Sequence, residues 1–203
     1  MSQDMWEYEH KYYDQGFDLV CGIDEAGRGP LAGPVCAAAV ILPKDVEIPG
    51  LNDSKKLSDK KRRELFPIIK DKALAWGIAF ADEKAIDEIN ILQATYLAME
   101  RAVAQLSVKP EILLVDGNRA KDFGIQTETV VHGDSLSASI AAASVLAKVS
   151  RDDFMLEMSE RYPEYSFEIH KGYGTKAHCE AILAHGPCDI HRRTFLKKLY
   201  GEK

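Results

Sequence analysis

The sequence predicts an α/β domain in which a mixed β-sheet is flanked by helices. Short apolar runs bounded by Gly and Pro are typical of buried strands, and several occur between residues 19 and 131. Segments with apolar residues at three- and four-residue steps have the spacing of one helix face, and they alternate with the later strands. With 203 residues, 46% of them hydrophobic, the chain can bury a core without disulfides or structural metal.

Runs of small and β-branched apolar residues predict the strands. The first two, 19–24 (LVCGID) and 35–42 (VCAAAVIL), are joined by GRGPLAGP, which consists almost entirely of turn-forming residues. The run 74–81 (LAWGIAFA) predicts a third strand. Two more are expected at 111–116 (EILLVD) and 127–131 (TETVV).

Helical spacing predicts long helices at 58–73, 86–106 and 135–162. Pro67 is expected to kink or split the first of them, because proline lacks the N–H of the helical hydrogen bond. The second carries one apolar stripe. The third is rich in Ala and Ser along one face, and such small side chains allow a close approach to whatever the helix packs on. Shorter helices are expected at 175–184 and 192–199.

These elements are expected to form one structural unit with three segments. They are an acidic N-terminal segment, 1–18, a core of sheet and helices, 19–162, and a C-terminal helical extension, 163–203. No run of about 18 apolar residues predicts a membrane span, and the N-terminus lacks a signal pattern, so we expect a cytoplasmic protein. A monomer is the expected oligomeric state. The cysteines form no CxxC pair and are expected to be reduced packing residues: Cys21, Cys36, Cys179 and Cys188.

Charge is distributed unevenly along the chain. The formal net charge is −6, which by itself disfavours a nucleic-acid partner. Residues 53–63, however, carry six Lys or Arg against two Asp, and 170–203 carry seven against three acids. A solvated helix face would explain the first segment equally well. A polyanion responds to the local field rather than to the total charge, so nucleic acid stays a candidate partner.

Acidic residues follow the predicted strands at three places. Asp24 and Glu25 end the first strand, Asp116 ends the fourth, and Asp134 follows the fifth. Carboxylates that converge at one end of a sheet repel one another unless cations neutralise them. All-oxygen ligands favour Mg²⁺ or Mn²⁺ over zinc, so the pattern predicts a site for one or two such ions. A turn at Asp116 and a helix cap at Asp134 are the alternative interpretations.

Two glycine-containing loops are candidate binding segments. GRGPLAGP does not have the spacing of a dinucleotide-binding loop, but its glycines allow backbone N–H groups to approach a ligand, and Arg28 offers a cation for a phosphate. The alternative is a tight turn with Arg28 in solvent. In HKGYGT, Tyr173 lies between two glycines, where its ring could stack on a sugar or a base.

Six ordered motifs resemble those of bacterial ribonuclease HII, the type 2 ribonuclease H family. They are GIDEAGRGPLAGPV, NDSKKLS, ILQATYLAMERA, VDGN, GDSLSASIAAASVLAKVSRD and HKGYGT. The resemblance as a whole covers the chain from about residue 19 to residue 200. The resemblance implies an RNase H-like mixed sheet flanked by helices with a C-terminal helical extension. It also implies cleavage of the RNA strand in RNA–DNA hybrids and incision 5′ of single ribonucleotides in duplex DNA, leaving 5′-phosphate and 3′-hydroxyl ends.

The resemblance also implies residue roles. The catalytic, metal-binding carboxylates would be Asp24, Glu25, Asp116 and Asp134. The substrate would be contacted by Gly27, Arg28, Gly29, Lys55, Ser139 and Tyr173. Two other functions stay open: another metal-dependent nuclease on the same fold, such as a junction resolvase, and a non-catalytic module that binds hybrids.

Overall fold

The computed structural model describes residues 5–201 and contains one mixed five-stranded sheet. The strand order is β3-β2-β1-β4-β5. The β1–β2 and β2–β3 pairs are antiparallel, whereas β1–β4 and β4–β5 are parallel. All five predicted strands are confirmed, as β1 (Val20–Ala26), β2 (Val35–Ile41), β3 (Ala75–Ala81), β4 (Ile112–Asp116) and β5 (Gln126–Val130).

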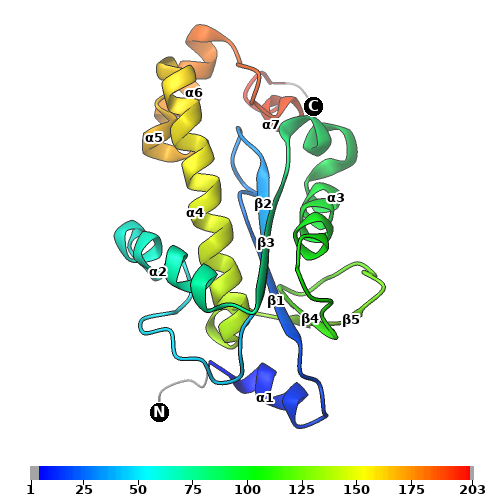
Figure 1. The fold of residues 1–203 in the computed structure, drawn as a ribbon. Helices are drawn as coiled ribbons and strands as arrows, with labels where there is room; N and C mark the ends of the chain where they lie inside the picture. The colour runs from blue at the N-terminus through cyan, green and yellow to red at the C-terminus, as the bar shows by residue number, and fades with distance from the viewer. Residues whose placement is uncertain (1–4, 202–203) are drawn as a thin grey trace.

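Helices cover both faces of this sheet, which confirms the predicted fold class (Figure 1). One face packs against α3, and the other packs against α4 with α2 beside it. The helices are α1 (Glu7–Tyr13), α2 (Asp59–Lys72), α3 (Glu83–Ala104), α4 (Ala138–Arg161), α5 (Phe167–His170), α6 (Lys176–His185) and α7 (Arg193–Leu196), with 3-10 turns at η1 (Gly133–Ser135) and η2 (Pro163–Tyr165). Within residues 5–201, no helix is both long and apolar enough to cross a membrane.

The predicted close approach of the Ala- and Ser-rich helix occurs at Gly22. A Cβ atom at Gly22 would lie only 2.2 Å from the backbone nitrogen of Ile140 and from the carbonyl carbon of Ser139. The first turns of α4 therefore rest directly on the backbone of β1, with no room for a side chain between them. This contact fixes the segment before α4, which carries Asp134, relative to the strand that carries Asp24.

Two predicted helices differ in detail from expectation. Helix α2 runs through Pro67 without being split. Helix α3 is interrupted at Asn90, whose φ of 66° is not helical. The Asn90 side chain accepts hydrogen bonds from the backbone N–H groups of Leu92 and Gln93, so it starts a new helical segment there. The continuous apolar stripe gave no sign of this break, because helical spacing resumes after it.

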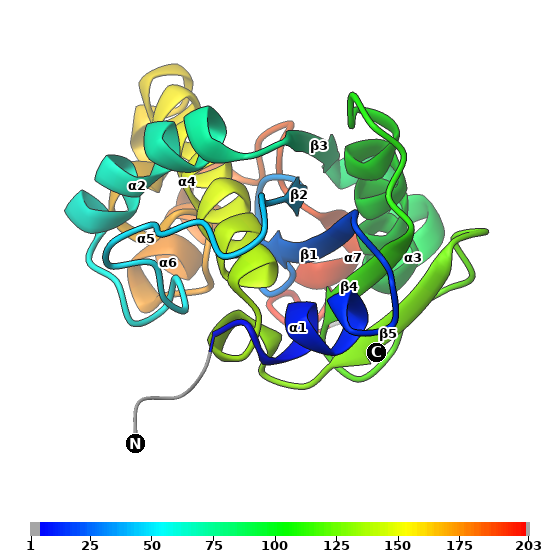
Figure 2. The same cartoon turned by 60° about the horizontal axis from the view of Figure 1, so that its bottom comes forward.

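The acidic N-terminal segment contains α1, which packs beside the β4–β5 edge and the start of α4 (Figure 2). Tyr12 joins the apolar cluster there, and its hydroxyl donates to Glu128 at 2.5 Å. Glu9 is fully buried, and its Oε1 accepts hydrogen bonds from the Ser137 hydroxyl and the Ser139 N–H. Helix α1 is therefore anchored to the N-terminus of α4, an interaction that the sequence interpretation did not include.

Candidate metal centre and substrate cleft

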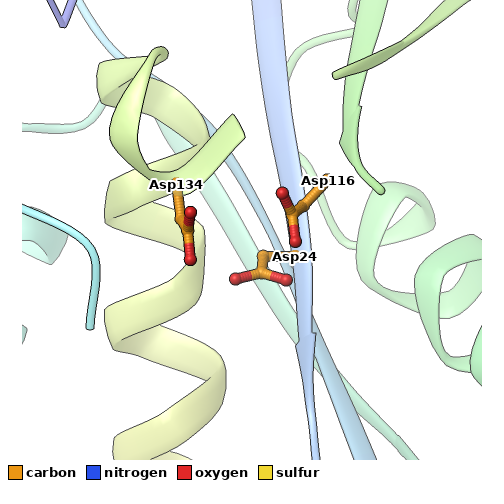
Figure 3. Close-up of side chains that lie close together, drawn as sticks. All are labelled: Asp24, Asp116 and Asp134. Atoms are coloured by element: carbon orange, nitrogen blue, oxygen red, sulfur yellow. The ribbon is translucent and has the colours of Figure 1, made fainter. Parts of the chain in front are cut away.

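Three carboxylates from distant parts of the chain meet at one end of the sheet. Strands β1 and β4 are parallel, and Ile23 pairs with Val115, so the next residues, Asp24 and Asp116, lie side by side. Beyond β5, the η1 turn brings in Asp134. One ligand oxygen from each of the three carboxylates lies within 4.8 Å of the others (Figure 3).

Local hydrogen bonds hold these carboxylates. Asp116 Oδ1 accepts from the backbone N–H of Gly133 at 2.8 Å, which connects β4 to the turn that carries Asp134. Asp24 Oδ1 accepts from the N–H of Glu25 at 2.7 Å. The alternative in which Asp134 caps the long helix is wrong, because Ser137 is the N-cap of α4 and accepts from Ile140 N–H.

Glu25 lies outside this group of three. Successive residues of a strand face opposite sides of the sheet, so Glu25 faces the α3 side when Asp24 faces the α4 side. Its Oε1 accepts a hydrogen bond from Arg28 Nη1 at 3.2 Å. Glu25 also lines a second cavity, together with Arg28, Asp116 and Arg119. Glu25 lines the main cleft beside Asp24 and Asp116 as well.

The acids raise one another's pKa values. Burial, followed by the charges of Glu25 and Asp116, raises the pKa of Asp24 well above its ordinary value. Burial and then the charge of Asp134 raise the pKa of Asp116. Lys55 Nζ lies 3.1 Å from Asp134 Oδ2 and offsets part of this repulsion. A cluster of hard oxygen ligands with excess negative charge fits Mg²⁺ or Mn²⁺.

A cavity of about 260 Å³ opens beside the carboxylates. It is lined by Asp24, Glu25 and Asp116 and by five of the residues predicted to bind substrate: Gly27, Arg28, Gly29, Lys55 and Tyr173. Tyr173 is 46% exposed, so its ring is available to a ligand. The loop at 27–29 and the loop around Tyr173 thus face the same space, although they lie far apart in the sequence.

Ser139 is not among the residues that line this cavity, and its contact with substrate stays a prediction. It lies in the first turn of α4 and is fully buried, and its backbone N–H donates to Glu9 Oε1 at 2.9 Å. Its hydroxyl has no hydrogen-bond partner within residues 5–201. The carbonyl carbon of Ser139 also lies against the backbone of β1, 2.2 Å from where a Cβ at Gly22 would stand.

Comparison with known proteins identifies the family. The profile of the family described as Ribonuclease HII matches residues 21–198. A ribonuclease HII from Endomicrobium trichonymphae is 58% identical over 196 residues, covering 96% of this chain and 93% of that protein. The chain belongs to the ribonuclease HII family. It is accordingly a ribonuclease H, an enzyme that hydrolyses phosphodiester bonds.

Solved structures share the fold. The ribonuclease H2 of Pyrococcus horikoshii OT3 superposes with a TM-score of 0.74 and 25% identity, covering 90% of this chain and 97% of that one. A Bst-RNase HIII solved in complex with Mn²⁺ superposes with a TM-score of 0.69 and 19% identity, covering 90% and 69% of the two chains. The RNase H-like fold expected from the motifs is therefore confirmed.

Two buried arginines of this ribonuclease HII chain were not identified from its sequence as site residues. Arg151 is 1% exposed and donates to the carbonyl oxygens of Ala32, Pro34 and Lys171. Arg192 is fully buried and donates to three other carbonyls of the 27–34 loop. The position of Arg151 after the Ala-rich part of a predicted helix could have indicated that its side chain is buried. Arg192 gave no such indication, because it lies in a basic segment that is typical of a surface.

The basic segment 53–63 has mixed roles in this ribonuclease HII chain. Lys55 lines the cleft. Arg62 instead donates to the carbonyls of Ser54 and Leu57, and Arg63 pairs with Asp59 and Asp153. Two of the charges counted in the sequence are therefore used within the fold and contribute less to binding a polyanion than an exposed lysine would.

Proposed function

We propose that this ribonuclease H cleaves the RNA strand of RNA–DNA hybrids and incises duplex DNA on the 5′ side of a single ribonucleotide, leaving 5′-phosphate and 3′-hydroxyl ends. The observation that carries the proposal is one cavity that combines the Asp24–Asp116 end of the carboxylate cluster with the 27–29 loop and Tyr173. Such a cavity can hold a scissile phosphate beside the acids and the neighbouring ribose beside the loop.

Asp24, Asp116 and Asp134 would hold one or two Mg²⁺ or Mn²⁺ ions, with Glu25 approaching from the other side of β1. Bound divalent cations supply Lewis-acid stabilisation of the charge that develops during phosphodiester hydrolysis. The chain itself contributes the fixed geometry of the oxygens. Neutralisation of the carboxylate cluster also removes the repulsion that raises the pKa values of Asp24 and Asp116.

Recognition of the ribonucleotide would come from the loop at 27–29. Glycines at 27 and 29 allow the backbone to approach the 2′-hydroxyl, the one group that separates RNA from DNA at a given nucleotide. Arg28 and Lys55 would contact neighbouring phosphates. The Tyr173 ring would stack on the deoxyribose that follows the ribonucleotide. Phosphate contacts carry no base information, so we expect strong dependence on salt and little sequence preference.

An incision assay tests this function. The substrates are two DNA duplexes of identical sequence, one with a single ribonucleotide, incubated with Mg²⁺, with Mn²⁺ or with chelator. We expect a cut on the 5′ side of the ribonucleotide, only in the presence of metal. Asp24→Asn should lower the rate by several powers of ten while folding is retained, whereas Asp71→Asn, on the exposed side of α2, should match the wild type.

The outcomes distinguish the alternatives. Cutting that ignores the ribonucleotide would favour another metal-dependent nuclease, such as a junction resolvase. Binding of the duplex without any cutting, unchanged in Asp24→Asn, would favour a non-catalytic binding module. Either result would overturn the proposal, because both contradict metal-dependent incision guided by the 2′-hydroxyl.

A further inference from the structure

Arg192 makes an unusual set of contacts for a buried charged residue. Its Nε donates to the carbonyl of Gly33 at 2.9 Å, Nη1 to that of Arg28 at 2.9 Å, and Nη2 to that of Gly27 at 2.5 Å. The side chain is fully buried. Among the described residues no carboxylate lies within salt-bridge distance of its guanidinium. The cation is satisfied by the three loop carbonyls and by the Phe195 ring, whose centroid lies 5.1 Å from Cζ.

The direction of these carbonyls fixes the direction of two backbone amides. In a trans peptide the C=O of one residue and the N–H of the next point in opposite directions, and no described peptide is cis. The carbonyls of Gly27 and Arg28 point inward to the guanidinium, so the N–H groups of Arg28 and Gly29 point away from it. All three loop residues line the cleft.

Neither of these N–H groups has an acceptor within residues 5–201. Backbone donors next to a cleft are free to bind a ligand oxygen, and adjacent donors of this kind form an anion- and hydroxyl-binding concavity. A positive charge on the carbonyl side of a peptide also draws electron density away from its N–H, which strengthens that N–H as a donor. Arg192 thus both aims and polarises the two amides.

We propose that Arg192 is a positioning residue for ribonucleotide recognition: through the Gly27 and Arg28 carbonyls, it holds the Arg28 and Gly29 amides toward the sugar–phosphate unit that carries the 2′-hydroxyl. The inference rests on the proposed function and extends it to a residue that never touches the substrate. It requires an arginine, because a planar guanidinium reaches three carbonyls at fixed angles, whereas a lysine has a single nitrogen.

The test measures discrimination rather than activity. Fluorescence anisotropy in chelator, where hydrolysis does not occur, gives the dissociation constants for a duplex with one ribonucleotide and for the matched all-DNA duplex. The ratio of the two constants is compared among the wild type, Arg192→Lys and the control Arg193→Lys. Arg193 is the exposed neighbour. Among the residues that the structure describes, its guanidinium hydrogen-bonds only to the Pro187 carbonyl, at 3.4 Å.

We expect the wild type and Arg193→Lys to bind the ribonucleotide duplex more tightly. Arg192→Lys should reduce that preference by about fivefold for each misdirected amide, the affinity factor of one hydrogen bond of about 1 kcal/mol. Affinity for the all-DNA duplex should stay near that of the wild type. A loss of general stability would weaken binding to both duplexes together and leave their ratio unchanged, and that result would overturn the inference.

A second measurement avoids the variant, in case Arg192→Lys does not fold. Backbone NMR of the wild type follows the Arg28 and Gly29 amides during titration with each duplex. The inference is supported if the chemical shifts of both amides change more with the ribonucleotide duplex than with the all-DNA duplex. Equal chemical-shift changes with the two duplexes overturn it. If the wild type does not prefer the ribonucleotide duplex at all, the proposed function fails first, which separates the two failures.

Discussion

Asp24→Asn is expected to stabilise the metal-free protein while it abolishes activity. Asp24 is 5% exposed and lies against two other carboxylates, so its charge is unfavourable without a cation. Asparagine has nearly the same shape and keeps an oxygen that can accept the hydrogen bond from the Glu25 N–H. The substitution therefore removes a charge and leaves the packing in place.

The size of the effect follows from the distances. Two unit charges 4.8 Å apart repel each other by about 3.5 kcal/mol at an effective dielectric constant of about 20. Lys55 beside Asp134 and partial protonation of the cluster reduce the net repulsion. We expect a gain of about 1–3 kcal/mol, which corresponds to an increase in Tm of roughly 3–10 °C for a chain of this length.

Thermal unfolding followed by circular dichroism, in chelator and with Mg²⁺, measures this effect. Raised acid pKa values in the folded state make stability fall as pH rises from the ordinary aspartate range, so the advantage of Asp24→Asn should grow with pH and disappear in acid. Added Mg²⁺ should stabilise the wild type more than the variant. A lower Tm for Asp24→Asn than for wild type in chelator at neutral pH would refute the argument from repulsion.

Three further predictions concern the fold around the site. Gly22→Ala should lower the free energy of unfolding, measured in urea, by about 3 kcal/mol or more, because its Cβ would overlap the backbone of α4. A decrease of less than about 1 kcal/mol would show that α4 can shift to make room. Burial raises the pKa of Glu9, so wild-type stability should fall as pH rises through that pKa. Glu9→Gln should therefore have a higher Tm than wild type at mildly alkaline pH. A Tm lowered as much as that of Glu9→Ala would contradict this. Burial lowers the pKa values of His178 and His191 to about 4, so stability should decline as pH falls from about 6.5 to about 4, and a flat stability profile in that range would rule this out.

The strands and the carboxylate cluster could be predicted from the sequence because both depend on local patterns. Each strand is a short apolar run, and the acids stand where those runs end. The parallel pairing of β1 with β4 then brings Asp24 to Asp116 without further information. Glu25 is predicted as a metal ligand from its place beside Asp24 and from the family resemblance. Alternation along the strand turns its side chain to the opposite face of the sheet from Asp24, and its role as a ligand stays a prediction.

Other features depend on contacts that no local pattern contains. Ser139 is in a polar motif, but its burial follows from the docking of α4 on Gly22 and of Glu9 on the helix N-terminus. The break at Asn90 depends on a left-handed backbone that an apolar stripe does not reveal. Arg192 was counted as part of a basic segment, and only its three carbonyl acceptors distinguish it from the exposed Arg193.

The cleft contains a buried cation, Arg151, that is not paired with the clustered carboxylates. Arg151 lines the same cavity as Asp24 and Asp116, yet its hydrogen bonds go to backbone carbonyls rather than to these acids. If its guanidinium bound the carboxylates, they would lose the excess charge that attracts divalent cations, and the loops would lose a support. Coordination of Arg151 by carbonyls therefore has two effects: it fixes the substrate loops, and it leaves the carboxylates available to metal.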